Sequence, residues 1–164
     1  MPSPAGSRPP RASGRPEVCS YCGCESIEVV GRFMAEHVDI INATTELRHA
    51  CAADDAPRVA RAVDGIEVIL HPHTRNEEVG LFAVLRRQEE FTEHVDTLCH
   101  EHTALDEQLL RIRNGEHALV PGFLAELRAH IDKEENGLFP ASAIALSGAE
   151  WDEVDASTPD PVAP

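Results

Sequence analysis

The sequence predicts an all-α protein, built as an up-and-down antiparallel four-helix bundle. Along four segments, apolar residues recur at intervals of three and four, which is the period of one face of an α-helix. The connections between these segments are short, so consecutive helices are expected to run antiparallel. Each apolar face also contains one histidine, and this shared interruption indicates where the bundle carries its chemistry.

The 164 residues divide into four parts by composition. Residues 1–17 are rich in Pro, Ser, Gly and Arg and are expected to form a disordered tail. Residues 18–25 form a cysteine-rich leader and residues 26–148 the helical bundle, which is long enough to bury a core. Residues 149–164 are acidic and punctuated by proline, so they too are expected to be a disordered tail.

The first helix is expected over about residues 26–50. The second helix begins after Asp54 or Asp55, either of which suits the N-cap, and it has Pro57 in its first turn. Its apolar face continues to Val84.

The third helix is expected over about residues 89–113, where the apolar face alternates steps of three and four without a break. Asn114 and Gly115 then end it. The fourth helix is expected to start at Pro121, because proline is favoured in the first turn, and to reach about Leu146.

The chain carries 14 Lys and Arg against 29 Asp and Glu, a formal net charge of -15. Such a charge repels nucleic acid and anionic membranes, so neither is expected as a partner. No run approaches the roughly 18 apolar residues of a membrane span, and the N-terminus lacks the apolar core of a secretory signal. A cytoplasmic location is therefore expected, with the five cysteines as reduced thiols.

Residues 73–82, HTRNEEVGLF, return as residues 130–139, HIDKEENGLF, with six of ten positions identical. In each copy a glutamate follows a histidine by four residues. On a helix such a pair stands about 6 Å apart on one face, so both groups are expected to point into the bundle. Gly80 and Gly137 are unfavourable inside a helix and are expected where a neighbouring helix approaches closely.

The interruptions of the four apolar faces are the candidate metal ligands. Burying ionisable groups costs several kcal/mol per ion, against a net stability of about 5–15 kcal/mol for a whole domain. A single histidine on an apolar face is more often a hydrogen-bonded core residue. Four at matching depth, together with two glutamates, favour a metal instead, because imidazole and carboxylate suit iron, manganese or zinc. The candidate ligands are His37, His73, Glu77, His102, His130 and Glu134.

The number of candidate ligands fits two metal ions better than one. Each ion would receive two imidazoles and one oxygen from each of two bridging carboxylates, Glu77 and Glu134. Positions would remain for a bridging oxo or hydroxo oxygen and for a small ligand.

These residues resemble those of the hemerythrin-like (HHE cation-binding) family. The resemblance rests on AEHVDII at residues 35–41, on EHTALDEQL at residues 101–109 and on the two His-x-x-x-Glu motifs, and it covers about residues 25–146. It implies a hemerythrin-like four-helix bundle with two iron ions in a non-haem centre, which binds O2 and, in various members, nitric oxide or peroxide. By this match the six candidate ligands are the iron ligands.

Two features depart from the oxygen-carrying hemerythrins. Those proteins place two histidines four residues apart on the third helix, whereas His102 has Leu98 and Asp106 at these distances. Their fourth-helix motif also ends in an aspartate five residues after its histidine, whereas Glu134 follows His130 by four. With one histidine fewer, sensing or peroxide chemistry is favoured over reversible oxygen carriage.

Three functions remain open at this point. The preferred one is a binding protein or sensor for O2, nitric oxide or peroxide in oxidative or nitrosative stress, working with a protein redox partner. The second is an enzyme that degrades peroxide. The third is a metal store or a structural metal bundle.

Cys19, Cys22 and Cys24 form a candidate second site for redox chemistry or an additional metal. The first two have the Cys-x-x-Cys spacing of zinc and redox sites, but three thiols leave a tetrahedral zinc site one ligand short. The alternative is that these thiols have no dedicated role. A cysteine-rich leader of this form resembles those on some bacterial members of the family.

Three acidic residues near the candidate ligands have less definite roles. Asp106 stands one turn beyond His102 and is expected to support it by a hydrogen bond rather than to bind metal. Glu78 and Glu135 each follow a candidate ligand and are either helix-surface charges or supporting partners.

Overall fold

The computed structural model describes residues 24–159, which form helices and turns without strands. Four helical rods make up the bundle, and two of them contain a π-helical turn, in which the backbone bonds span five residues instead of four. A short 3-10 turn, η1 (Cys24–Ser26), precedes the first rod. The rods are α1 (Glu28–Ala52); α2 (Ala56–Glu77) with the π segment η2 (Glu78–Phe82) and α3 (Ala83–Leu85); α4 (Glu89–Arg113); and η3 (His117–Leu119), α5 (Val120–Lys133), the π segment η4 (Glu134–Leu138) and α6 (Phe139–Ala145).

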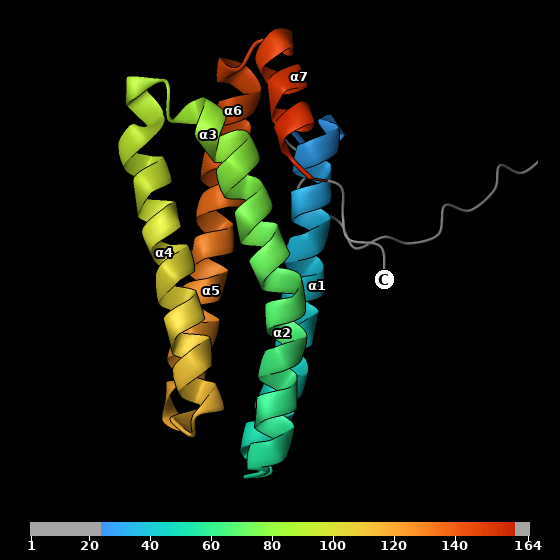
Figure 1. Cartoon of the computed structure of the whole chain (residues 1–164), viewed down its shortest axis with the longest axis vertical. Coiled ribbons are helices and arrows are strands. Elements are labelled where there is room, and N and C mark those ends of the chain that lie inside the picture. Colours follow the sequence, from blue (N-terminus) through green and yellow to red (C-terminus); the bar gives the residue numbers. More distant parts are fainter. Residues whose placement is uncertain (1–23, 160–164) are drawn as a thin grey trace, which may run out of the picture.

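The rods run alternately in opposite directions, so the α1–α2 and α4–α5 connections lie at one end of the bundle (Figure 1). Around the bundle the order is α1, α2, α4 and α5, with α5 again beside α1. This arrangement confirms the predicted all-α, up-and-down bundle.

Local sequence signals account for the turns at that end. Asp55 caps α2, because its side chain accepts a hydrogen bond of 3.0 Å from the backbone N–H of Arg58. Asp54 adopts a φ of 51° in the tight turn before it. After α4, Gly115 has a φ of 105°, a conformation that glycine adopts without steric cost.

Two apolar clusters fill the bundle, one toward each end. The first includes Phe33, Leu81, Phe82, Leu98 and Phe139. The second includes Ile40, Leu70, Leu105, Phe123 and Leu127. On every rod the candidate ligand lies between the residues of the two clusters, so the histidines and glutamates form a polar layer inside an apolar core.

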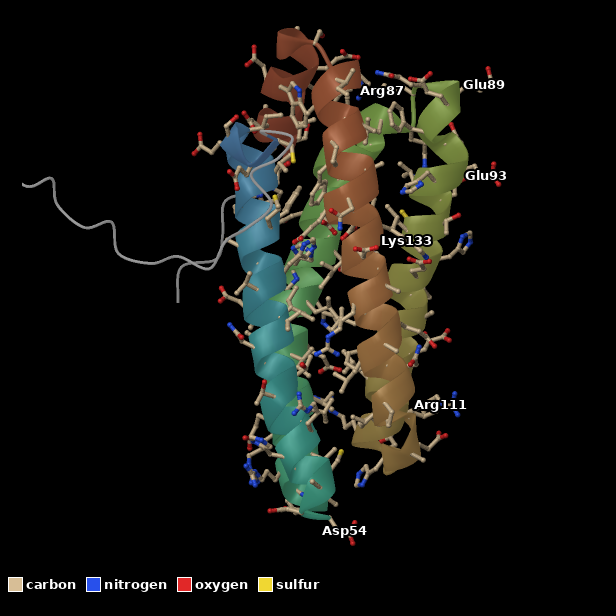
Figure 2. The ribbon with its side chains drawn as sticks, turned by 180° about the vertical axis from the view of Figure 1, so that it is seen from behind. Asp54, Arg87, Glu89, Glu93, Arg111 and Lys133 are labelled. Atoms are coloured by element: carbon tan, nitrogen blue, oxygen red, sulfur yellow. The ribbon has the colours of Figure 1, made fainter. Side chains whose placement is uncertain are left out.

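The outer surface is polar, as the net charge leads one to expect. Glu93 and Arg111 project outward from α4 in Figure 2. None of the helices between residues 24 and 159 combines the length and apolar character that a membrane span requires.

The expectation of a disordered tail after residue 148 is wrong. This segment forms a further helix, α7 (Gly148–Ser157). Ser147 and Glu150 form a capping box at its start, and Val154 is fully buried in the first cluster. Arg87 donates two hydrogen bonds, of 2.9 and 2.6 Å, to the Glu153 carboxylate. The apolar contact and the cap stabilise this helix despite its acidic composition.

Close approach explains one of the two repeated glycines. A Cβ on Gly80 would clash with Oγ1 of Thr158, just beyond α7, so the helix end rests directly on the η2 backbone. At Gly137 the nearest atom to such a Cβ is Cε1 of His94, at 3.9 Å, which is an ordinary contact. The expectation of close approach is therefore confirmed for Gly80 only.

The two glycines make a matched pair for mutation. Gly80→Ala is expected to displace the end of α7 and to destabilise the protein by about 1–3 kcal/mol, the usual cost of overpacking. Gly137→Ala is expected to stabilise it by about 0.5–1 kcal/mol, because alanine is the better helix former and has room. Urea unfolding of both variants measures these changes, and shifts in the same direction would contradict the assignment of the contact with α7.

Candidate metal centre

All six residues predicted as metal ligands meet in the polar layer between the two apolar clusters. His37 comes from α1, His73 and Glu77 from α2, His102 from α4, His130 from α5 and Glu134 from the start of η4. None of the six is more than 4% exposed. The layer is therefore shielded from solvent and contains only groups that bind protons or metals.

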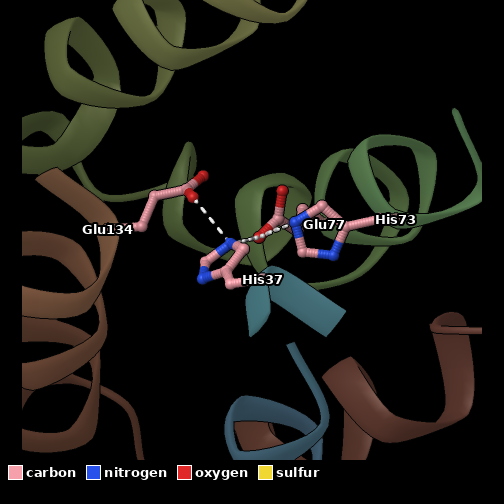
Figure 3. A group of neighbouring side chains, drawn as sticks. All are labelled: His37, His73, Glu77 and Glu134. Atoms are coloured by element: carbon pink, nitrogen blue, oxygen red, sulfur yellow. Dashed lines mark ion pairs between the residues drawn. The ribbon is translucent and has the colours of Figure 1, made fainter. Parts of the chain in front are cut away.

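The six residues form two overlapping groups of four, in each of which one candidate ligand atom per residue lies within 4.8 Å of the others. Both groups contain Glu77 and Glu134. The first adds His37 and His73, which Figure 3 shows grouped around Glu77 and Glu134. The second adds His102 and His130.

The two carboxylates face both groups at once. Oε1 of Glu77 lies 3.4 Å from Nε2 of His73, while its Oε2 lies 3.5 Å from Nε2 of His102. Glu134 likewise contacts one imidazole of each pair. Its Oε2 lies 3.1 Å from Nε2 of His37, and its Oε1 lies 3.3 Å from Nε2 of His130. Each glutamate thus directs one oxygen to each pair of imidazoles, which is the geometry of a bridging carboxylate.

The chemistry of these atoms fits bound cations. Both oxygens of Glu77, both oxygens of Glu134 and Nε2 of His37 are buried without a hydrogen-bond partner. A buried carboxylate without partners is costly, and each unsatisfied group of this kind calls for a physical explanation. Positive ions between the two imidazole pairs would satisfy all of these atoms together.

The outer nitrogen of every imidazole is also held by a carboxylate. Nδ1 of His73 pairs with Glu36 at 2.8 Å and Nδ1 of His102 with Glu78 at 2.8 Å. The other two pairs are of the same kind and length: His130 with Glu101 at 2.9 Å and His37 with Glu135 at 2.9 Å.

These contacts form a ring around the layer. Each rod points an imidazole inward and offers a glutamate that adjoins one of its candidate ligands to the imidazole of a neighbouring rod, in the order α1 to α2, α2 to α4, α4 to α5 and α5 to α1. An Nδ1–H that donates to a carboxylate leaves Nε2 with its lone pair directed at the centre. The ring therefore directs the four Nε2 atoms at the centre, where Nε2 of His102 and Nε2 of His130 form a hydrogen bond of 3.0 Å, whose proton a bound cation would have to displace.

Sequence reasoning missed part of this ring. The sequence does not decide between surface charge and support for Glu78 and Glu135, and the structure gives them the supporting contact. Glu36 and Glu101 were not singled out, although each directly precedes a candidate ligand in a Glu-His pair. That repeated pair is the signal, because a residue one position before an inward-facing histidine points sideways, toward the next rod.

Burial and close charges distribute protons unevenly within the metal-free layer. Burial, reinforced by the charge of Glu134, raises the pKa of Glu77 well above its usual range. Burial opposes the charged form of His37, but the contacts with Glu134 and Glu135 outweigh it and raise the pKa of His37 to about 9. For His73, burial prevails and lowers the pKa. A bound cation therefore has to displace a proton from His37 at neutral pH.

The remaining sequence expectations have mixed outcomes. Asp106 does not support His102 but pairs with His71 of α2, at 3.2 Å, so that expectation is corrected. Cys19 and Cys22 lie outside the described residues. Cys24 is 1% exposed and packs in the first apolar cluster. A site shared by the three cysteines remains a prediction.

Fold and site together define a class of protein, a four-helix bundle with a buried histidine and carboxylate centre. The family model described as the Hemerythrin HHE cation binding domain matches residues 29–142, a range that contains all six candidate ligands. The chain belongs to this family and is a helical, metal-binding domain of that type. Neither the curated proteins nor the solved structures gave a match.

The carboxylate ring predicts a measurable effect on metal binding. Glu36→Ala is expected to weaken binding by about 10–100-fold, because His73 loses the partner that fixes its ring and tautomer. Glu28→Ala, an exposed position on the same helix, is the control and is expected to bind as the wild type does. Competition with a chelator of known affinity measures both, and equal affinities would show that the ring does not support the centre.

Proposed function

We propose that the bundle holds two iron ions and binds a small ligand, O2, nitric oxide or peroxide, at this centre. One ion would lie between His37 and His73, the other between His102 and His130, and Glu77 and Glu134 would bridge them. The observation that carries the proposal is the pair of buried carboxylates whose four oxygens have no hydrogen-bond partner and face both imidazole pairs.

Family membership and donor chemistry support iron as the metal. Imidazole and carboxylate donors suit iron, manganese and zinc, and the HHE family favours iron among them. A loaded centre of this kind supplies open coordination positions where a small ligand binds and where electrons are exchanged.

The chain's own residues prepare the centre for that chemistry. The four ring glutamates fix the imidazoles, so little reorganisation is needed when a metal or ligand arrives. On the side of the first cluster, Phe82 stacks on His102 with ring centroids 5.8 Å apart, and Phe139 stacks on His37 at 6.0 Å. These rings exclude water from one face of the layer and favour a small ligand of low polarity.

We assign this centre to sensing, or to the response to oxidative or nitrosative stress. The support is the donor set of four histidines, one fewer than in oxygen-carrying hemerythrins. Each imidazole pair has the same surroundings of two nitrogens and two shared carboxylates, so neither half of the centre has the additional histidine of a carrier.

The test is the metal content and the ultraviolet-visible spectrum of protein purified without added metal. Two iron ions per chain are expected, one for each group of four ligands, with absorption bands that change when the reduced protein meets O2, nitric oxide or peroxide. A ligand recovered unchanged supports binding or sensing, whereas peroxide that is consumed over many turnovers would identify an enzyme. Zinc or no metal, with a flat spectrum and intact helices, would contradict the proposal.

Variants separate the centre from adventitious metal binding. His73→Ala is expected to lose both the iron and the spectral response, because His73 is one of two imidazoles in its group. His94→Ala removes an exposed imidazole of α4 and is expected to keep both. Equal iron content in the two variants would refute the ligand assignment.

A further inference from the structure

The two halves of the bundle correspond to each other, which allows one helix-helix seam to be compared with another. His102 on α4 follows His37 on α1 by 65 positions, and His130 on α5 follows His73 on α2 by 57. The same intervals relate Glu36 to Glu101 and Gly80 to Gly137. The seam between α1 and α2 is therefore the counterpart of the seam between α4 and α5.

The α4–α5 seam contains a hollow of about 230 Å³ that opens to solvent. It is lined by Glu101, Ala104, Leu105, Glu126, Ala129 and Lys133. The two alanines face solvent, whereas Leu105 is 2% exposed and belongs to the second apolar cluster, so the hollow reaches the core.

The corresponding places between α1 and α2 hold one larger and one more deeply buried side chain. Pro72 stands where α5 has Ala129, and Asn76 stands where it has Lys133. Asn76 is 6% exposed, while the side chain of Lys133 is 44% exposed and lies on the outside of the bundle (Figure 2). The two seams thus differ in the side chains that stand at these equivalent positions.

The two halves of the centre also differ in the aromatic residues that pack against their imidazoles. Phe33 packs edge-on against His73, with ring centroids 5.7 Å apart. Its counterpart on α4, 65 positions later, is Leu98, an aliphatic residue. The aromatic packing around the two halves of the centre therefore differs at this position.

One side chain connects the hollow to the centre. The Glu101 carboxylate lines the hollow and also pairs with Nδ1 of His130 at 2.9 Å. Lys133, the single lysine of the chain, binds the same carboxylate from the outer side. At this point the ion pair between Lys133 and Glu101 therefore separates solvent from the His130 imidazole.

We propose that this hollow is the route by which the small ligand reaches the centre, on the side of His102 and His130, and that Ala104 and Ala129 set its width. The inference rests on the proposed function. The lining carries two carboxylates and one ammonium group, so it disfavours anions and admits small uncharged molecules such as O2, nitric oxide and hydrogen peroxide.

The first test uses metal-free protein and so does not depend on iron. The Nδ1 proton of His130 is expected to exchange with water faster than that of His73, as measured by NMR. Filling the hollow with Ala104→Leu and Ala129→Leu is expected to slow exchange at His130 several-fold and to leave His73 unchanged. Both substitutions keep good helix formers at exposed positions, so the fold is retained.

The matched control is Asp39→Leu, which places the same side chain at the exposed counterpart of Ala104 on α1. It is expected to leave exchange at His130 unchanged. Exchange at His130 that is no faster than at His73, or that does not respond to filling the hollow, would overturn the proposed route.

The second test follows nitric oxide with the reduced, iron-loaded protein by stopped-flow absorbance. In the filled variant, association and dissociation are expected to slow together by several-fold at unchanged affinity, because narrowing a route does not change the free energies of the free and bound states. Unchanged rates at equal iron content would overturn the route. A wild type that binds no nitric oxide would contradict the proposed function instead, and the exchange measurement would still decide whether the hollow leads to the centre.

Discussion

The arrangement of the bundle depends on two carboxylates buried without hydrogen-bond partners, Glu77 and Glu134. Burying an ionisable group costs several kcal/mol per ion, a large share of the net stability of about 5–15 kcal/mol that a domain of this size has. This cost arises in the layer where all four rods direct an imidazole into the bundle. Metal binding therefore contributes directly to folding, since the loaded centre removes a penalty that the metal-free protein carries.

The ring of four glutamates connects that centre to the architecture. Because each rod supplies an inward imidazole and a sideways carboxylate, every pair of neighbouring rods is linked at the same level by one hydrogen bond between the two groups. The contacts fix both the orientation of each candidate imidazole ligand and the relative height of the rods. The internal repeat accounts for half of these groups. One His-x-x-x-Glu-Glu pattern provides two candidate ligands and one glutamate of the ring in each half of the bundle.

Much of the fold and the candidate site could be predicted, because their signals are local. Periodicity located the four rods, and the polar interruptions of their apolar faces identified the six residues that the structure brings together. The ring partners Glu36 and Glu101 were missed because a sideways contact depends on which rods are neighbours and at what height. The helix after residue 148 could not be predicted from composition, because the segment is acidic and contains prolines. Its stability comes from a capping box at Ser147 and from the buried side chain of Val154. The difference between the two seams became visible only when equivalent side chains could be compared in space.

The most direct test of the central claim is anomalous X-ray diffraction at the iron edge, from crystals of protein purified without added metal. Two peaks per chain are expected, one beside Nε2 of His37 and His73 and one beside Nε2 of His102 and His130, with the carboxylates of Glu77 and Glu134 between them. A single peak, or none at these nitrogens, would contradict the bridged two-iron centre on which the functional account rests.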